Sequence, residues 1–232
     1  MCGRFTQYRA QVRYLERLNS QAPLAFEPSD TLIDRYNVAP TTLVQVILLG
    51  DQGLRMQATP WGYAPHWARG TGKRPPAINA RLETAVTSRY WANAWKSGRC
   101  LVPADGWFEW VKDPNTKEKQ PYYIKLRSDE AMFLAAIGNF PQGPNETSDA
   151  DGFAIVTTAS DQGLLDIHDR MPVVLPPDVA NEWLETGLAP ERAEDLAKYH
   201  GESIDSFKWY RVGKEVGNVA NKGSELIAKA DR

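Results

Sequence analysis

A succession of strand-like stretches through the middle of the 232-residue chain constrains its fold more than any other feature. Runs of β-branched and aromatic residues bounded by Gly, Pro, Asn and Asp are typical of strands. Such runs occupy residues 43–49, 54–61, 99–112, 120–127, 131–140 and 151–159. A turn at residues 50–53 joins the first two, and the polar residues 113–119 predict a hairpin between the third and the fourth.

Helix-like stretches lie on both sides of these strands. Apolar residues at helical spacing predict helices within residues 8–20, 83–98, 176–187 and 191–200. Gly98 is expected to end one of them, and Pro177 and Gly187 to lie near the start and the end of another. Residues 27–42 and 62–81 are rich in Pro with Asp or Gly and are expected to be irregular.

The order of these elements predicts the fold class. No repeat, low-complexity tract or linker divides the chain. We therefore predict an α+β fold with a single domain over residues 1–232, built on a mixed, barrel-like β-sheet with flanking helices.

Composition limits the classes of function. The formal net charge of −2 excludes a strongly basic surface, so nucleic-acid binding would need a local patch. The 2 cysteines, without a CxxC motif, predict neither a disulfide framework nor a metal site, and we expect no cofactor. Arginines interrupt the N-terminal segment, which excludes a signal peptide, and the apolar runs are too short to span a membrane. A cytoplasmic protein with free thiols is expected.

One of the two cysteines directly follows the initiator methionine. Removal of Met1 would give Cys2 a free α-amine beside its thiol. Such an aminothiol can attack an acyl carbon with its own amine as base, or condense with an aldehyde to an imine that the thiol closes into a thiazolidine. From position alone, an incidental Cys2 behind a retained methionine is equally open.

The stretch DGWFEW carries a carboxylate among aromatic residues. In a strand, Trp107, Glu109 and Val111 share one face, while Phe108 and Trp110 share the other. Desolvation by such neighbours raises the pKa of a carboxyl group toward the range useful for acid–base catalysis. The alternative is a glutamate at a sheet edge that pairs with a lysine.

Two further polar pairs stand out. Asn79 and Arg81 would point to one face of an extended chain and could bind a phosphate or orient a carbonyl, or they are a turn residue and a surface residue. His168 lies between Asp166 and Asp169, which suits proton transfer or phosphate binding, or a satisfied structural histidine. The 8 tryptophans gather in loop-like stretches beside arginines, an arrangement that serves either core packing or a platform for single-stranded nucleic acid.

The ordered motifs MCGRF, RYNVAP, WGYAPHW, INARLET, DGWFEW, DIHDRMP and VGNVANKG resemble those of the SRAP (SOS response-associated peptidase) family. The resemblance runs from residue 2 to about residue 227. It implies an α+β domain that forms a thiazolidine crosslink with abasic sites in single-stranded DNA during the DNA damage response. It also implies associated lyase and self-processing activities.

The same resemblance implies the site residues. Cys2 corresponds to the crosslinking nucleophile, Asn79 to a residue that positions it, Glu109 to a proton-transfer group and His168 to a group beside the 3′ phosphate. The expected DNA-binding residues are Arg4, Asn37, Trp67, Arg81, Arg89, Tyr90 and Arg170. A monomer that associates with the nucleoid on damaged DNA is expected. The alternatives are an N-terminal-nucleophile cysteine peptidase and a DNA reader without catalysis.

Overall fold

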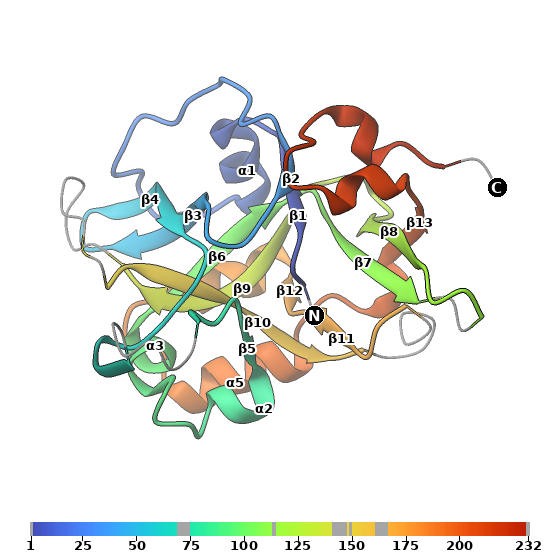
Figure 1. The fold of residues 1–232 in the computed structure, drawn as a ribbon. Coiled ribbons are helices and arrows are strands. Elements are labelled where there is room, and N and C mark those ends of the chain that lie inside the picture. Colours follow the sequence, from blue (N-terminus) through green and yellow to red (C-terminus); the bar gives the residue numbers. More distant parts are fainter. Residues whose placement is uncertain are drawn as a thin grey trace.

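The computed structural model describes residues 2–68, 75–112, 115–140, 148, 150–160 and 167–230. Its strands form two sheets, and Figure 1 shows how these lie in the fold. The smaller sheet has the order β13 (Phe207–Arg211), β8 (Lys119–Leu126), β7 (Gly106–Lys112), β1 (Phe5–Gln7), β2 (Arg35–Val38). The larger sheet has the order β11 (Arg170–Pro172), β10 (Gly152–Ala159), β9 (Met132–Asn139), β6 (Arg99–Ala104), β3 (Leu43–Gly50), β4 (Gly53–Pro60).

Two short strands, five α-helices and the short 3₁₀-helices His66–Ala68, Ile204–Ser206, Lys214–Gly217 and Ser224–Ile227 complete the regular structure of the described residues. β12 (Val174–Leu175) pairs with β9, and β5 (Asn79–Arg81) runs parallel to β10, which makes the larger sheet mixed. The helices are α1 (Gln11–Leu18), α2 (Leu82–Ala85), α3 (Ala92–Ser97), α4 (Pro177–Leu184) and α5 (Pro190–Tyr199). The α+β class is therefore confirmed, with two sheets in place of one and no closed barrel among the described strands.

Buried side chains arrange these elements in layers. Phe5 and Trp107 of the smaller sheet share one apolar cluster with Val102 and Leu134 of the larger sheet, so the two sheets pack face to face. The outer face of the larger sheet packs against the helices, and the outer face of the smaller sheet packs against residues 212–227. Cys2 lies in the cluster between the sheets, so the first residues of the chain are held inside the fold.

The chain changes sheets within residues 99–112, which the sequence predicts as one strand. Asp105 breaks the strand, and its buried carboxylate accepts a hydrogen bond of 2.6 Å from the Tyr14 hydroxyl. The next residue must be glycine, because a Cβ at Gly106 would lie 2.3 Å from the ring of Tyr123. The hairpin predicted between residues 99–112 and 120–127 is confirmed only for the second half of the first stretch. That half is β7, which pairs with β8, whereas the first half is β6, which joins the larger sheet.

Two other sequence predictions are wrong. Residues 83–98 form α2 and α3 rather than one helix, because Ser88 accepts hydrogen bonds from the N–H groups of Tyr90 and Trp91 and turns the chain. Gly98 does end α3 as predicted, where its own carbonyl accepts the Gly138 N–H. The second is the irregularity of residues 27–42 and 62–81, since these contain β2 and β5.

Arg99 provides the largest expected stability effect outside the site. The buried guanidinium donates to five carbonyl oxygens, those of Trp95, Lys96, Trp183, Glu185 and Leu188. Removal of the donor leaves several buried acceptors unpaired, so Arg99→Met should lower the free energy of unfolding by on the order of 4 kcal/mol. Urea denaturation measures this change. Arg13→Met, which removes an exposed guanidinium, should change stability by less than about 1 kcal/mol, and equal losses in both would contradict this role.

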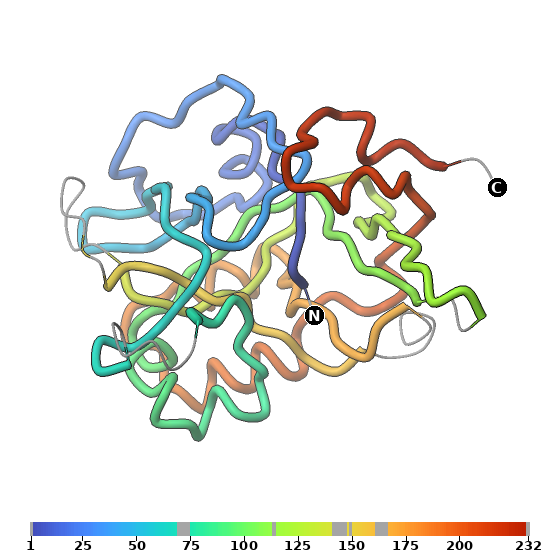
Figure 2. Tube along the Cα trace, viewed as in Figure 1, coloured from blue at the N-terminus to red at the C-terminus, as the bar shows by residue number. Residues whose placement is uncertain are grey.

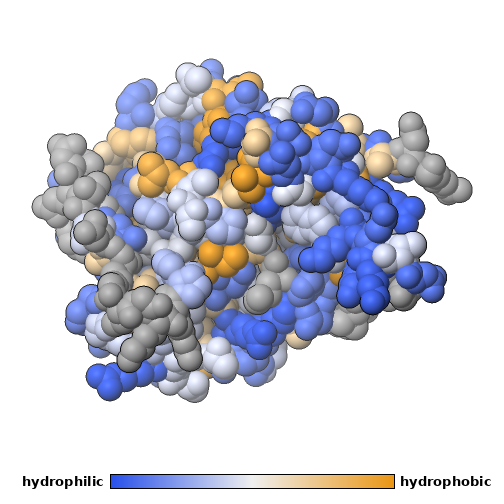
Figure 3. Space-filling model, viewed as in Figure 1, coloured by the Kyte–Doolittle hydropathy of each residue, from blue (hydrophilic) through white to orange (hydrophobic). Residues whose placement is uncertain are grey.

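Membrane-spanning helices and large apolar areas are both absent from the parts of the molecule that the structure describes and Figure 3 displays. No helix within the described residues has the length and apolar character needed to cross a membrane. On the face shown in Figure 3, hydrophobic residues form small separate areas, and the region around the end of the β7–β8 hairpin is strongly hydrophilic. Nowhere among the described residues do three or more His, Cys, Asp or Glu side chains gather in a way that could hold a metal ion.

Candidate functional site

Cys2 lies at the centre of the candidate site. It is fully buried just before β1, and the side-chain amide of Asn79 on β5 donates a 2.9 Å hydrogen bond to its carbonyl oxygen. β1 runs antiparallel to β7. Phe5 pairs with Trp107, and the Phe108 N–H donates a 2.9 Å hydrogen bond to the Arg4 carbonyl. Continued past Arg4 and Phe108, this register places Gly3 opposite Glu109 and Cys2 one residue further along, where the charge of Glu109 acts on its thiol.

Glu109 is buried on the face of β7 that packs between the sheets. Its side chain is only 3% exposed, and burial raises the pKa of its carboxyl group from 4.5 to about 7, with a further contribution from the charge of Asp169. Burial and the negative charge of Glu109 also raise the pKa of the Cys2 thiol. The thiol and the carboxyl group are therefore electrostatically linked, and both protonated and ionised Glu109 are populated near neutral pH.

His168 lies in the loop that precedes β11. Its Nδ1 accepts a 3.0 Å hydrogen bond from the Arg170 N–H and lies 2.8 Å from a carboxylate oxygen of Asp169. Burial lowers the pKa of the half-buried ring, which favours the neutral form. Asp166, the other predicted neighbour, lies outside the described residues.

Two buried polar atoms, one on the residue that bonds to Cys2 and one on the strand of Glu109, have no hydrogen-bond partner within the described residues. They are the side-chain oxygen of Asn79 and the indole Nε1 of Trp107. A buried donor or acceptor without a partner costs free energy, and such atoms are commonly used by a bound ligand. Sequence reasoning missed the Trp107 N–H, although its position on the same strand face as Glu109 was the available signal.

Three residues predicted to bind DNA are engaged within the protein. Arg170 forms a bidentate pair with Glu83 at 2.7 and 2.9 Å and donates to the Thr157 carbonyl. Asn37 is 9% exposed, and Arg4 bonds to its side-chain oxygen at 2.7 Å. In this conformation these side chains hold other parts of the fold, and DNA contact by them stays a prediction.

The remaining predicted DNA-binding residues lie at the surface. Trp67 is 52% exposed, and Arg81 and Arg89 are also exposed. Tyr90 is half-buried, because its hydroxyl donates to the Tyr63 carbonyl at 2.9 Å, and its ring packs edge-on against Trp67 with centroids 6.1 Å apart. Trp67 is therefore the exposed end of an aromatic cluster.

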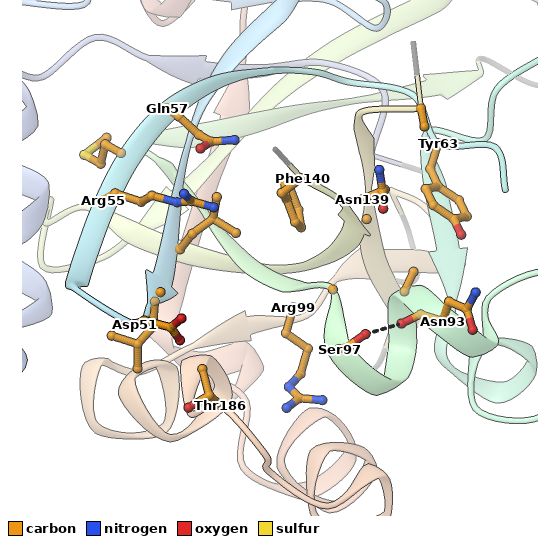
Figure 4. Close-up of a pocket in the computed structure, with 18 of the residues that line it drawn as sticks. Asp51, Arg55, Gln57, Tyr63, Asn93, Ser97, Arg99, Asn139, Phe140 and Thr186 are labelled. Atoms are coloured by element: carbon orange, nitrogen blue, oxygen red, sulfur yellow. Dashed lines mark hydrogen bonds between the residues drawn. The ribbon is translucent and has the colours of Figure 1, made fainter. Parts of the chain in front are cut away.

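A separate cavity of about 790 Å³ lies beside the β3–β4 hairpin and α3. Figure 4 shows that its labelled lining is mostly polar, with Asp51, Arg55 and Asn139 around Phe140. None of the predicted catalytic residues lines it, and no cysteine belongs to its described lining. The cavity is therefore distinct from the site around Cys2.

Comparisons with known proteins identify the family of the chain. The model of the family "SOS response associated peptidase (SRAP)" matches residues 1–219. The abasic site processing protein YedK of Escherichia coli is 42% identical over 98% of this chain and 99% of its own length. The abasic site processing protein HMCES of Rattus norvegicus is 27% identical over 100% of this chain and 76% of its own length.

Solved structures give the same result. A phage-related protein of Bordetella bronchiseptica has a TM-score of 0.73 and 37% identity, and the match covers 91% of this chain and 94% of that one. A protein of Bacteroides thetaiotaomicron has a TM-score of 0.77 and 20% identity over 99% of this chain and 100% of that one, which bears on the fold alone. The chain belongs to the SRAP family.

Proposed function

We propose that this protein recognises abasic sites in single-stranded DNA and closes a covalent thiazolidine link through Cys2 once Met1 has been removed. The observation that carries the proposal is the burial of Cys2 beside Glu109, whose carboxyl pKa is raised to about 7. The abasic site processing proteins that resemble this chain over nearly its full length support the substrate. The direct test is an adduct with abasic DNA that survives denaturation.

The proposed reaction forms two bonds to C1′ of the ring-opened sugar. The α-amine of Cys2 attacks the aldehyde carbon to give a carbinolamine, and loss of water gives an imine. The sulfur then attacks the same carbon, and the thiol proton is transferred to the nitrogen, so the net change is addition of the aminothiol with release of one water. Both closing atoms belong to one residue, and the second step is therefore intramolecular and fast.

The described residues supply the proton transfers that these steps require. Glu109 can protonate the departing hydroxyl of the carbinolamine and accept a proton in the reverse direction, because its pKa lies near neutral pH. The raised pKa of the Cys2 thiol keeps the sulfur protonated until ring closure. Neutral His168 can donate a hydrogen bond to a sugar hydroxyl or to the 3′ phosphate, and the partner-free oxygen of Asn79 can accept one from a sugar hydroxyl. Elimination from the imine would give lyase activity.

The peptidase alternative is less well supported. The buried thiol has a raised pKa, which disfavours the thiolate that attacks an amide. Cleavage of the bond between Met1 and Cys2 needs an oxyanion donor that reaches the carbonyl of Met1. Asn79 instead donates to the carbonyl of Cys2. Turnover of peptides in trans would favour this alternative.

The exposed aromatic and basic residues suit a single strand. We expect Trp67→Ala to weaken binding of a single-stranded oligonucleotide roughly tenfold, because a base loses its stacking partner. Fluorescence anisotropy at fixed salt measures the affinity. Tyr199→Ala is the matched control, since Tyr199 is 67% exposed on α5, and it should leave the affinity unchanged. Equal effects in the two variants would contradict a stacking role for Trp67.

A further inference from the structure

The motif VGNVANKG belongs to a segment that covers the back of the strand that carries Glu109. Residues 212–227, here called the C-terminal segment, pack Val216 and Leu226 against Phe108 on the outer face of β7. Figure 2 shows this segment, in red, beside the blue first strand of the chain. The segment therefore contacts the smaller sheet on the side opposite Glu109.

Asn37 fastens this segment to β2. Its side-chain nitrogen donates toward three carbonyl oxygens, those of Val216 at 3.3 Å, Asn218 at 3.1 Å and Asn221 at 2.9 Å. Its side-chain oxygen accepts from Arg4 at 2.7 Å. Both polar atoms of the amide are thus used inside the protein, and the residue is 9% exposed.

Arg4, which immediately precedes β1, joins the same segment to the start of the chain. One guanidinium nitrogen donates to Asn37 and also to the Val216 carbonyl at 2.9 Å, across 212 positions of sequence. The guanidinium carbon lies 5.9 Å from the ring centre of Trp110, and the Arg4 carbonyl accepts the Phe108 N–H. Arg4 therefore contacts both neighbours of Glu109 and stands two residues after Cys2.

We propose that the C-terminal segment is a positioning element for the reaction, and that Asn37 and Arg4 act as positioning residues that fix Cys2 against Glu109. The inference rests on the proposed function. A chain terminus frays unless it is tied down, and a misplacement of about 1 Å can cost on the order of a hundredfold in rate. The hydrogen bonds of Asn37 and Arg4 to the C-terminal segment, here called the latch, supply the restraint on the first residues of the chain.

The test replaces the hydrogen-bond donor of the Asn37 side chain with an acceptor and keeps the shape of the side chain. Asn37→Asp keeps the oxygen that binds Arg4 and turns the side-chain nitrogen into an oxygen that three carbonyls repel. At saturating abasic oligonucleotide, the rate of adduct formation should fall roughly tenfold or more. The oligonucleotide concentration that gives half the maximal rate should change less than about twofold. Hydrogen exchange at residues 216–221 should become faster.

Asn93→Asp is the matched control, because it makes the same substitution at an exposed residue of α3, outside the C-terminal segment. It should leave the saturated rate and the exchange unchanged. A raised half-saturating concentration with an unchanged saturated rate in Asn37→Asp would instead identify Asn37 as a DNA contact and overturn the proposal. Unchanged kinetics and exchange would overturn it as well.

Two outcomes separate this inference from the proposed function. A wild-type protein that forms no adduct contradicts the proposed function itself, whereas adduct formation at the wild-type rate in Asn37→Asp contradicts only the positioning role. If Asn37→Asp does not fold, Val216→Ala provides the second test. It loosens the contact with Phe108 while the latch remains, and the saturated rate should again fall without a change in half-saturation.

Discussion

Replacement of Cys2 by alanine should abolish the denaturation-resistant adduct with single-stranded DNA that carries an abasic site. The expectation follows from the proposed chemistry, in which both the amine and the sulfur of this residue bond to C1′. Loss of the thiol leaves at most an imine, which hydrolyses on heating in detergent. The measurement is the fraction of labelled oligonucleotide that migrates with protein on a denaturing gel.

Cys100→Ala is the matched control for this experiment. Cys100 is also fully buried, belongs to the same apolar cluster between the sheets, and has a thiol pKa raised by burial. Its loss should leave adduct formation intact. An adduct that persists in Cys2→Ala, or that disappears equally in Cys100→Ala, would contradict the role of Cys2 as nucleophile.

Replacement of Glu109 by glutamine should slow adduct formation by on the order of a hundredfold and remove its pH dependence near 7. The wild-type rate should be greatest near neutral pH, where both forms of the carboxyl group are populated, and should fall as Glu109 becomes fully ionised or fully protonated. The amide keeps the shape of the side chain and cannot exchange a proton. Single-turnover rates between pH 5 and 9 provide the comparison.

The same substitution should also raise the stability of the protein at high pH. The folded state keeps the Glu109 proton up to about pH 7, whereas an unfolded chain loses it near 4.5. Between these values the folded state binds more protons, so wild-type stability falls as the pH rises. At pH 8, Glu109→Gln should be more stable by about 3 kcal/mol, and below pH 4 the two should be equal.

Denaturant unfolding at several pH values measures this difference. Glu118→Gln, which removes an exposed carboxyl group at the end of β8, serves as the control and should show no such pH dependence. A Glu109→Gln protein that is less stable than wild type at pH 8 would contradict a protonated, buried carboxyl group in the folded state.

The sequence predicted the features that depend on local pattern. Alternation along residues 107–111 placed Trp107 and Val111 on one strand face and Phe108 and Trp110 on the other, and the two apolar clusters confirm this. The hairpin of β3 and β4 around residues 50–53 is also confirmed. Both predictions rest on the two-residue period of a strand and on turn chemistry, which are properties of neighbouring residues.

Features that depend on contacts between residues far apart in the chain could not be predicted from the sequence. Nothing local shows that the chain changes sheets at Asp105, because its partner Tyr14 is 91 positions away. The pairing of Arg170 with Glu83 and the latch at Asn37 likewise join residues that are far apart in the chain. The order of the motifs predicted that these arginine and asparagine side chains bind DNA. The periodicity of the sequence could not reveal that the same side chains form contacts inside the protein.

The central claim is that the aminothiol of Cys2 bonds to the sugar of an abasic site, and intact mass spectrometry tests it most directly. The wild-type protein, incubated with an abasic single-stranded oligonucleotide, should give one species. Its mass should be that of the chain without Met1, plus the oligonucleotide, less one water, and it should take up no hydrogen from borohydride, as a closed thiazolidine requires. An unmodified protein mass, or an adduct that retains Met1, would contradict the account.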